Sequence, residues 1–465
     1  MHAAAVEISA PPVRRKRRVV AILLLLVLGG WFARFAYLRI TLEPTPRPEY
    51  WAEKIAALDP PPAGALPENA ILSLLADRPF EVAYSAATST QPYMYQGDPT
   101  APLRGPWDAT RIDIVEVGKV FESSEFIQLR RQLIDATHRG WNIRVTPTPT
   151  PALSHFSPFR AWVKWLVAHS RWSIEHAGDP ESAAEDWRTV LRMCREIERG
   201  GIVINRLVAI GCVALLSREM ILDSKDAPAG TAGRLIEYVD ALGSHERTFV
   251  GEQYFIDSTL EYRYVREGGN WLAVNHAATF YGAAVPPSAV WNITSPIFYD
   301  LETARKKVAD MFQSTAECRD LVTAARKYRD VRGGPDLGAL VGERGWSSRL
   351  LTRMALLDFR ARAEGEGSVT ILALEEYRKR NGHYPGELRE LVPGFLPRLP
   401  IDTADGQALR YRRTDAGFVL YSIAENGKDD GGVIMRTGSQ IDREPRWERD
   451  ADFIFTDIRR QPVSN

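Results

Sequence analysis

Residues 162–198 read WVKWLVAHSRWSIEHAGDPESAAEDWRTVLRMCREIE. Apolar residues recur every three or four positions on both sides of Gly178-Asp179-Pro180, a pattern typical of two amphipathic helices joined by a turn. The glycine favours the end of one helix and the proline favours the start of the next. The stretch therefore predicts a helical hairpin. The pattern does not recur at a fixed period, so a repeat array is not predicted.

The same helical spacing continues on both sides of this hairpin. Turn residues at Gly200-Gly201 and at 226–230 separate the segments from one another. We therefore expect an all-α helical domain over residues 124–367, in a chain whose fold class is mainly α. The helices predicted most clearly are Trp162–His176, Ser182–Glu198, Ile202–Leu222 and Leu301–Arg329.

Composition limits the classes of function. The chain has 465 residues, 45% hydrophobic and 25% charged, which suits two or three globular domains. Lys plus Arg equals Asp plus Glu at 59 each, so no nucleic-acid partner is expected. Cys194, Cys212 and Cys318 form no CxxC pair, and neither a disulfide framework nor a zinc knuckle is indicated. Each cysteine lies in an apolar helical stretch, where a small buried side chain is expected.

The N-terminus combines a basic cluster with an apolar run. Five consecutive cations at 14–18 precede residues 19–38, which as one helix would rise about 30 Å, the thickness of a hydrocarbon core. The sequence thus predicts a transmembrane helix over 19–38 that acts as a signal anchor, with the lipid bilayer as its partner. The positive-inside rule then predicts a cytoplasmic basic tail at 1–18, a single-pass protein of the inner (cytoplasmic) membrane, and a periplasmic bulk. A cleaved signal peptide is the alternative.

Residues 39–123 are rich in proline, including Pro44, Pro46, Pro48 and the run at 60–62. Because proline interrupts regular elements, we expect a spacer with one short helix near Glu68–Leu75.

Common catalytic motifs are missing from the sequence. It contains no HExxH pair, no GxSxG elbow, no GxxxxGK[ST] phosphate loop and no glycine-rich dinucleotide fingerprint. We therefore expect no enzyme, no catalytic residue and no cofactor-binding residue. His169 and His176 are expected at the surface or as helix caps. The alternative hypothesis is an enzyme or small-ligand binder with its site in the helical domain, lined by Trp165, Trp172, Trp271 or Tyr281.

From residue 368 the pattern changes to one helix followed by short strands. The helix is predicted to end at Asn381-Gly382, because glycine suits a left-handed cap and Pro385 forbids continuation. Strand-like runs at Leu409–Arg413 and Phe418–Ala424 flank a turn. Residues 368–465 should therefore form a small α+β domain with an antiparallel sheet.

Four motifs in this region occur in a recognisable order. They are ALEEYRKRNGHYP (373–385), ELVPGFLPRLPID (390–402), DGQALRYRR (405–413) and GFVLYSIAENGKDDGG (417–432). In this order the region resembles the C-terminal domain of the major pseudopilin of type II secretion systems. The whole chain also resembles large envelope proteins of planctomycete-like bacteria that carry this module after a helical domain.

The resemblance implies a metal site. In the pseudopilins the loop after the second strand binds calcium, which takes six to eight oxygen ligands. Carried over by position, Ser422, Asn426, Asp429 and Asp430 would be ligands of Ca²⁺, with Asn426 where the family commonly has aspartate. An ordinary solvated hairpin turn is the alternative.

The resemblance also implies a compartment and a class of function. We expect a membrane-anchored extracytoplasmic structural or interaction protein whose partners are envelope proteins, linked to secretion or envelope assembly. Assembly into a pseudopilus itself is not expected, because residues 19–38 offer no prepilin-peptidase pattern and residues 39–367 separate them from the module.

Overall fold

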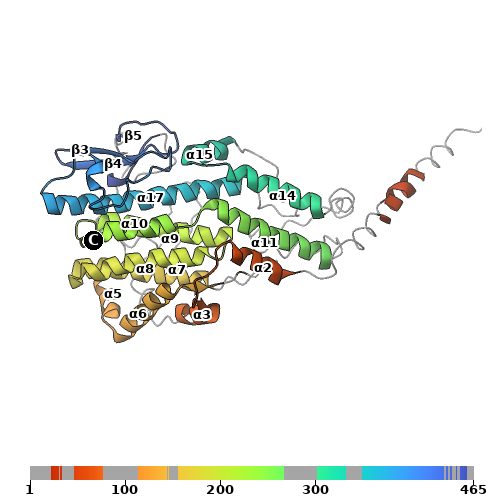
Figure 1. Ribbon diagram of the computed structural model, residues 1–465, viewed down its shortest axis with the longest axis horizontal. Helices are drawn as coiled ribbons and strands as arrows, with labels where there is room; N and C mark the ends of the chain where they lie inside the picture. Colours follow the sequence, from red (N-terminus) through yellow and green to blue (C-terminus); the bar gives the residue numbers. More distant parts are fainter. Residues whose placement is uncertain are drawn as a thin grey trace, which may run out of the picture.

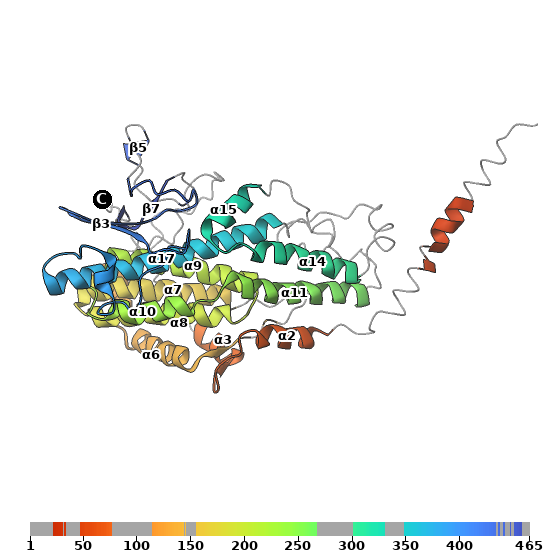
Figure 2. The ribbon, with the colours of Figure 1, turned by 45° about the horizontal axis from the view of Figure 1, so that its top comes forward.

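The helices of this chain lie side by side in an elongated bundle, and a small sheet covers one side of it (Figure 1). Figure 2 shows the same arrangement from another side, with α2, α3 and α6 along the opposite edge of the bundle. The computed structural model describes residues 22–30, 32–33, 47–76, 114–143, 145, 155–266, 301–330, 348–433, 436–437, 440–441, 447 and 451–457.

The described chain is mainly helical, with a small antiparallel sheet near the C-terminus, as the sequence pattern predicted. The helices are α2 (Pro48–Ala57), α3 (Glu68–Ala76), α5 (Ile114–Phe121), α6 (Ser124–Arg139), α7 (Phe156–Trp172), α8 (Pro180–Glu198), α9 (Val203–Leu222), α10 (Thr231–Ala241), α11 (His245–Arg266), α14 (Leu301–Ala316), α15 (Leu321–Asp330) and α17 (Ser348–Asn381). The strands are β1 (Leu66–Pro67), β2 (Trp141–Asn142), β3 (Arg410–Thr414), β4 (Gly417–Ser422), β5 (Arg436–Thr437), β6 (Gln440–Ile441) and β7 (Phe453–Ile454).

The predicted hairpin of α7 and α8 is confirmed, together with its turn. Helix α7 continues into a π-helical turn, η2 (Ser173–Ala177), and Gly178 follows in the left-handed conformation with φ 63°. The side chain of Asp179 accepts a hydrogen bond from the Ser182 amide at 3.0 Å, and Pro180 occupies the first turn of α8. Cap chemistry readable from the sequence therefore sets this boundary.

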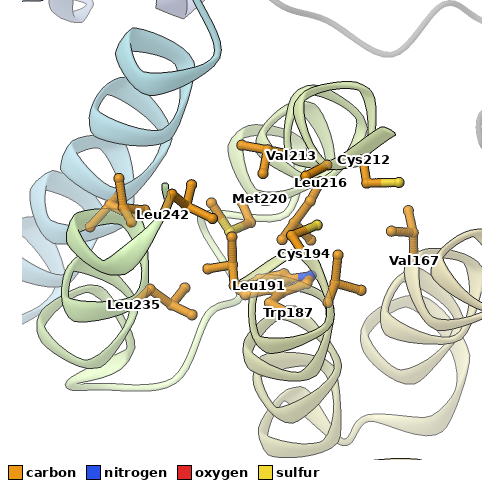
Figure 3. Close-up of a cluster of buried hydrophobic side chains, with 14 of the residues drawn as sticks. Val167, Trp187, Leu191, Cys194, Cys212, Val213, Leu216, Met220, Leu235 and Leu242 are labelled. Atoms are coloured by element: carbon orange, nitrogen blue, oxygen red, sulfur yellow. The ribbon is translucent and has the colours of Figure 1, made fainter. Parts of the chain in front are cut away.

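The apolar core lies where α7, α8, α9 and α10 meet. Figure 3 shows side chains of three of these helices in contact, among them Trp187, Leu191, Leu216, Met220 and Leu235, all of them buried. Cys194, Cys212 and Cys318 are free and buried, which confirms their expected place as small buried side chains.

Helix α17 joins the helical bundle to the C-terminal sheet. It packs against α9, α10 and α15, and it also contacts β4 and the short 3-10 helix η5 (Phe455–Asp457). Glycines permit the closest approaches: a Cβ at Gly365 would lie 3.1 Å from the Val239 side chain, and one at Gly367 would lie 2.4 Å from the ring of Phe455. One continuous helix thus crosses the expected boundary at 367/368.

Strands β3 and β4 form the antiparallel pair that the sequence predicted. Arg410 is paired with Tyr421 at one end and Thr414 with Gly417 at the turn. Strand β7 adds to the other side of β4, where Ser422 is paired with Phe453. In the order β3-β4-β7, strand β7 leads into η5, and η5 contacts α17.

Two regions differ from the predicted helices. The run predicted at Leu301–Arg329 is divided into α14 and α15, because Asp320 caps a new helix by accepting from the Thr323 amide at 2.6 Å. The spacer at 39–123 contains α2 and α5 in addition to the expected α3. Pro48 does not prevent α2, because proline is tolerated in the first helical turn, where its missing N–H costs no hydrogen bond.

The predicted transmembrane helix and signal anchor need correction. In the part of the chain with described coordinates, no helix is both long and apolar enough to span a bilayer. Of the segment 19–38, the structure describes residues 22–30 and 32–33, which are helical. The other residues of the segment lie outside the described part. The predicted single-pass orientation across the inner membrane depends on the same segment and stays a prediction.

A buried charge network ties four helices together. Asp358 of α17, with no exposed surface, accepts from Arg206 Nε of α9 at 2.8 Å and lies 3.0 Å from His245 Nδ1 of α11. The Arg206 guanidinium also pairs with Glu198 of α8. Burial alone would raise the pKa of Asp358, but Arg206 and His245 hold it well below its usual range. The carboxylate is therefore ionised and satisfied inside the core.

A second buried carboxyl lies on α11 without a cationic partner among the described residues. Glu252 is 2% exposed, and its Oε2 accepts from the Val203 amide at the start of α9, at 2.7 Å. Burial raises its pKa to about 7, although the hydrogen bond from Val203 acts in the opposite direction. The neutral form is thus favoured in the folded protein below about pH 7.

We expect the substitution Asp358→Asn to lower the free energy of unfolding by about 3–5 kcal/mol, because it leaves Arg206 buried without its charge partner. Urea unfolding at pH 7 measures the change. The matched control is Asp240→Asn, whose half-exposed ion pair with Arg398 should contribute no more than about 1 kcal/mol. Equal losses in the two variants would contradict a special role for the buried network.

We expect Glu252→Gln to remove a pH dependence of stability. A carboxyl whose pKa rises on folding contributes stability below its unfolded pKa, near 4.5, and loses that contribution as pH rises through the folded value of about 7. At pH 8 the glutamine variant should therefore be more stable than the wild type by on the order of 3 kcal/mol, with little difference at pH 4.5. Urea unfolding across this range measures it, with the half-exposed Glu246→Gln as the control.

Candidate functional site

The four expected calcium ligands lie in two different environments. Ser422 is fully buried, and its hydroxyl donates to Asp402 Oδ1 at 2.7 Å. Asp429 and Asp430 are exposed on the loop after β4. The Asn426 amide donates to Asp430 Oδ2 at 3.0 Å, which directs an N–H group, not an oxygen, toward that carboxylate.

Their contacts give calcium no independent support. Asp429 Oδ1 already accepts from the Tyr421 hydroxyl at 2.9 Å and from the Gly431 amide at 3.0 Å. Within the described ranges, no group of three or more His, Cys, Asp or Glu side chains is placed so that it could hold a metal ion. Calcium binding therefore stays a prediction from the resemblance.

Asp402 organises this module, and sequence reasoning did not single it out. This buried carboxylate accepts from the Ser422 hydroxyl, from the amides of Ala404 and Ile423 at 3.0 Å each, and from Arg410 Nη1 at 3.2 Å. Burial raises its pKa in spite of these bonds. The side chain joins the loop before β3 to the end of β4. An aspartate shortly before a predicted strand was the one available signal.

One histidine of the helical domain lies in an unexpected place. His169 was expected at the surface or as a cap, and this was wrong: it is 6% exposed, with Nδ1 2.5 Å from Asp186 Oδ2. Arg130 Nε of α6 donates to the other oxygen of Asp186 at 2.6 Å. Asp186 is fully buried, and each of its two carboxylate oxygens has a partner, His169 or Arg130. A buried carboxylate needs such partners because it has no water to bind.

Aromatic rings surround this histidine. The ring centroids of Phe121 and Trp172 lie 5.1 and 5.7 Å from that of His169. The structure thus brings Trp172, and through Phe121 also Trp165, beside a carboxylate-bound imidazole. His176 is exposed on η2, and the other two aromatic residues of the expected pocket, Trp271 and Tyr281, lie outside the described residues. The cluster is closely packed, so its geometry indicates a core contact.

A second aromatic group covers the C-terminal end of α17, which extends past the neighbouring helices (Figure 2). The Tyr377 and Phe395 rings lie 5.4 Å apart, and the Tyr384 and Phe418 rings lie 4.8 Å apart. Tyr411 joins the second pair, 6.0 Å from Phe418. These rings are half-buried. We define the tip face as these five rings with two exposed cations beside them: Tyr377, Tyr384, Phe395, Tyr411 and Phe418 with Arg380 and Arg413.

Hydrogen bonds hold the three tyrosines of the tip face in place. The Tyr377 hydroxyl donates to Glu390 at 2.5 Å, Tyr384 to Glu375 at 2.7 Å, and Tyr411 to the Pro385 carbonyl at 2.7 Å. Burial raises the pKa of Tyr384 and of Tyr411 to about 12, and the bond to Glu390 raises the pKa of Tyr377. All three phenols are therefore neutral at physiological pH and each ring has a defined orientation.

Arginines lie over two rings of the tip face. Arg380 lies over the Phe395 ring, with its Cζ 5.8 Å from the centroid, and Arg378 lies 5.7 Å from the Tyr384 ring. The acids Glu387 and Glu390 are engaged in a capping box at the 3-10 helix η4 (Leu388–Leu391). Arg380, Arg389 and Arg413 are exposed beside the face.

The local sequence explains why these side chains are presented together. Gly382, with φ 80°, ends α17, and its amide donates to the Arg378 carbonyl at 2.8 Å. The chain then turns back so that Tyr384 meets the β3–β4 hairpin, whose side chains alternate between the two faces. The sequence analysis predicted the helix end and the hairpin, but not that one aromatic surface spans both.

Comparisons of the chain with family models, with curated proteins and with solved structures found no match. The likeness of the C-terminal region to the pseudopilin module therefore stays a prediction from the sequence.

Calcium binding can be decided by calorimetry on the full chain. If the resemblance is right, titration of CaCl₂ should produce a saturable heat in the wild type that is lost in the Asp429→Ala, Asp430→Ala double variant, because both carboxylates would be ligands. Asp415→Ala, an exposed acid in the β3–β4 turn, is the control and should keep the heat. A wild type without a saturable heat would remove calcium from consideration.

Proposed function

We propose that this chain is a non-catalytic interaction protein that binds an acidic protein surface through its tip face. The observation that carries the proposal is the set of five rings and two arginines held at the end of one long helix. The resemblance to the pseudopilin module suggests proteins of secretion or envelope assembly as the class of partner.

The residue types of the tip face favour protein binding. Tyrosine, phenylalanine and arginine are enriched at the centres of protein interfaces, where they contribute most of the binding energy. Tyr377, Tyr384 and Tyr411 already have fixed hydroxyls, so little side-chain freedom remains to be lost when a partner binds. Arg380 stacked beside Phe395 adds a planar donor group at the border.

The way in which α17 is packed also supports a scaffold role for the tip face. Helix α17 packs against α9 and α10 before it reaches the tip face. Its residue Asp358 also pairs with Arg206 of α9 and His245 of α11. A partner on the tip face would therefore be held in a defined orientation relative to the whole bundle. A structural or interaction protein needs this property, because it positions one molecule against another.

The charge of the border selects among partners. Arg380 and Arg413 are exposed beside the rings, whereas Glu387 and Glu390 are engaged in the capping box and Glu390 also accepts from Tyr377. A partner surface with acidic side chains would approach faster and in one register, whereas a basic one would be repelled. Binding should accordingly weaken as ionic strength rises.

Site-specific photocrosslinking in intact cells tests this proposal. With p-benzoylphenylalanine at Phe395, we expect an adduct of discrete mass, because that ring would lie inside the interface. The same group at Ile127, an exposed apolar residue of α6, should produce no such adduct.

Charge reversal supplies the second arm of the test. Arg380→Glu with Arg413→Glu should lower the yield of the Phe395 adduct by roughly tenfold, because like charges would then face each other. The matched pair Lys306→Glu with Arg326→Glu, exposed cations of α14 and α15, should leave the yield unchanged. An adduct that is insensitive to charge at the tip, or that forms equally from position 127, would contradict the proposal.

A further inference from the structure

Three arginines converge on a single carboxylate at the edge of the bundle. Arg195 Nη1 lies 2.5 Å from Asp59 Oδ2, and Arg247 Nη1 lies 3.0 Å from the same oxygen. Arg199 Nη1 lies 3.1 Å from Asp59 Oδ1. Arg195 is in the last turn of α8, Arg199 is the residue that caps the C-terminal end of α8, and Arg247 is in the first turn of α11. All four side chains are partly shielded from solvent, with exposures between 14% and 28%.

From this geometry we propose that Arg195, Arg199 and Arg247 form a binding site for an oxyanion, either a phosphate or a carboxylate group, and that Asp59 occupies it as a built-in substitute for the ligand. The site lies on α8 and α11, whereas the tip face belongs to α17 and the sheet, so this proposal is independent of the proposed function.

The number of cations exceeds what one aspartate requires. A carboxylate is satisfied by one bidentate guanidinium, whereas several arginines around one point are characteristic of phosphate and multiply charged ligands. Glu196 is the second acid in contact, 3.1 Å from Arg199 Nε, but its Oε2 also accepts from the Trp141 amide at 2.8 Å. Among the described contacts, three guanidinium groups thus face two carboxylates.

The electrostatics agree with an anion site. Burial alone would raise the pKa of Asp59, but the hydrogen bond and charge of Arg195, with Arg247 and Arg199, lower it, so the carboxylate is ionised. Burial, together with repulsion from Arg195, lowers the pKa of Arg247. An anion at this point therefore relieves repulsion among the arginines, and removing Asp59 would leave that repulsion uncompensated.

Asp59 belongs to a segment at the outside of the bundle, next to α2, which packs on α11 through buried Trp51 and Ile55. It follows α2 directly, and the next residue, Pro60, accepts from Arg199 Nη1 through its carbonyl at 3.0 Å. Figure 2 places α2 along the outside of the bundle, beneath α11. At its start α2 is held by polar contacts to Glu261, from Arg47 Nε at 2.9 Å and from Trp51 Nε1 at 2.6 Å. An oxyanion ligand would compete with this segment for the arginines.

The test is thermal unfolding of the full chain in sodium chloride, sodium phosphate and sodium acetate at matched ionic strength. Asp59→Ala empties the site, so we expect its Tm to rise by roughly 3 °C or more in phosphate, or in acetate if carboxylates are preferred, relative to chloride. The wild type should show no such difference. Asp240→Ala, which removes the half-exposed partner of Arg398, is the control and should behave as the wild type.

Adding Arg195→Gln and Arg247→Gln to Asp59→Ala should abolish the anion-dependent rise. If Asp59→Ala does not fold in chloride, Asp59→Asn, which keeps the size of the side chain, is measured in the same way, and folding that returns only in phosphate or acetate supports the proposal. Identical Tm values in the three salts, unfolding in all of them, or a rise that survives loss of both arginines would overturn it.

Discussion

A charged carboxylate without access to water, that of Asp358, constrains the whole bundle. Removing an ion from water costs several kcal/mol even after relaxation, so the surrounding groups must compensate it. They come from different helices: Arg206 from α9 and His245 from α11, with Arg362 on α17 itself at 3.4 Å. His245 Nε2 also lies 3.1 Å from the Cys318 carbonyl, which brings the turn between α14 and α15 into the same network. Helices that share these contacts cannot shift independently.

Asp358 lies on α17, and further contacts hold this helix along its length up to the surface. The helix is held by charge pairs in its first half, by the close contacts at Gly365 and Gly367 in the middle, and by the glycine cap at Gly382. Because a buried helix is stiff over this length, the rings at its end keep their position relative to the bundle. The C-terminal sheet packs on the same helix that crosses the bundle, and its aromatic side chains lie beside the end of that helix.

Charges serve two different purposes in this protein. In the network of Asp358, Arg206 and Glu198, positive and negative groups are buried together and complete one another. At Asp59 the arginines outnumber the acids and remain partly open to solvent. The buried network of Asp358 favours a unique packing. At Asp59 three guanidinium groups share one carboxylate, so their N–H groups could also bind a ligand. Unused capacity is what distinguishes a binding site from a structural ion pair.

Local patterns in the sequence were enough to predict the helical hairpin, its turn at Gly178 to Pro180, the end of α17 and the β3–β4 pair. These features depend on residues a few positions apart, through caps and apolar periodicity. The transmembrane helix predicted at 19–38 is the exception, because no helix among the described residues is long and apolar enough to span a bilayer.

Tertiary structure alone decided which distant residues meet. Asp186 and Arg130 are 56 positions apart, Asp59 and Arg195 are 136 apart, and Arg206 and Asp358 are 152 apart. No periodicity or spacing links such pairs, because the packing of helices against one another places them. The burial of His169 and the union of α17 with the hairpin into one aromatic surface have the same origin. The sequence by itself determined most of the elements, because caps and apolar periodicity are local, and the long-range packing of those elements determined the charge networks and the candidate sites.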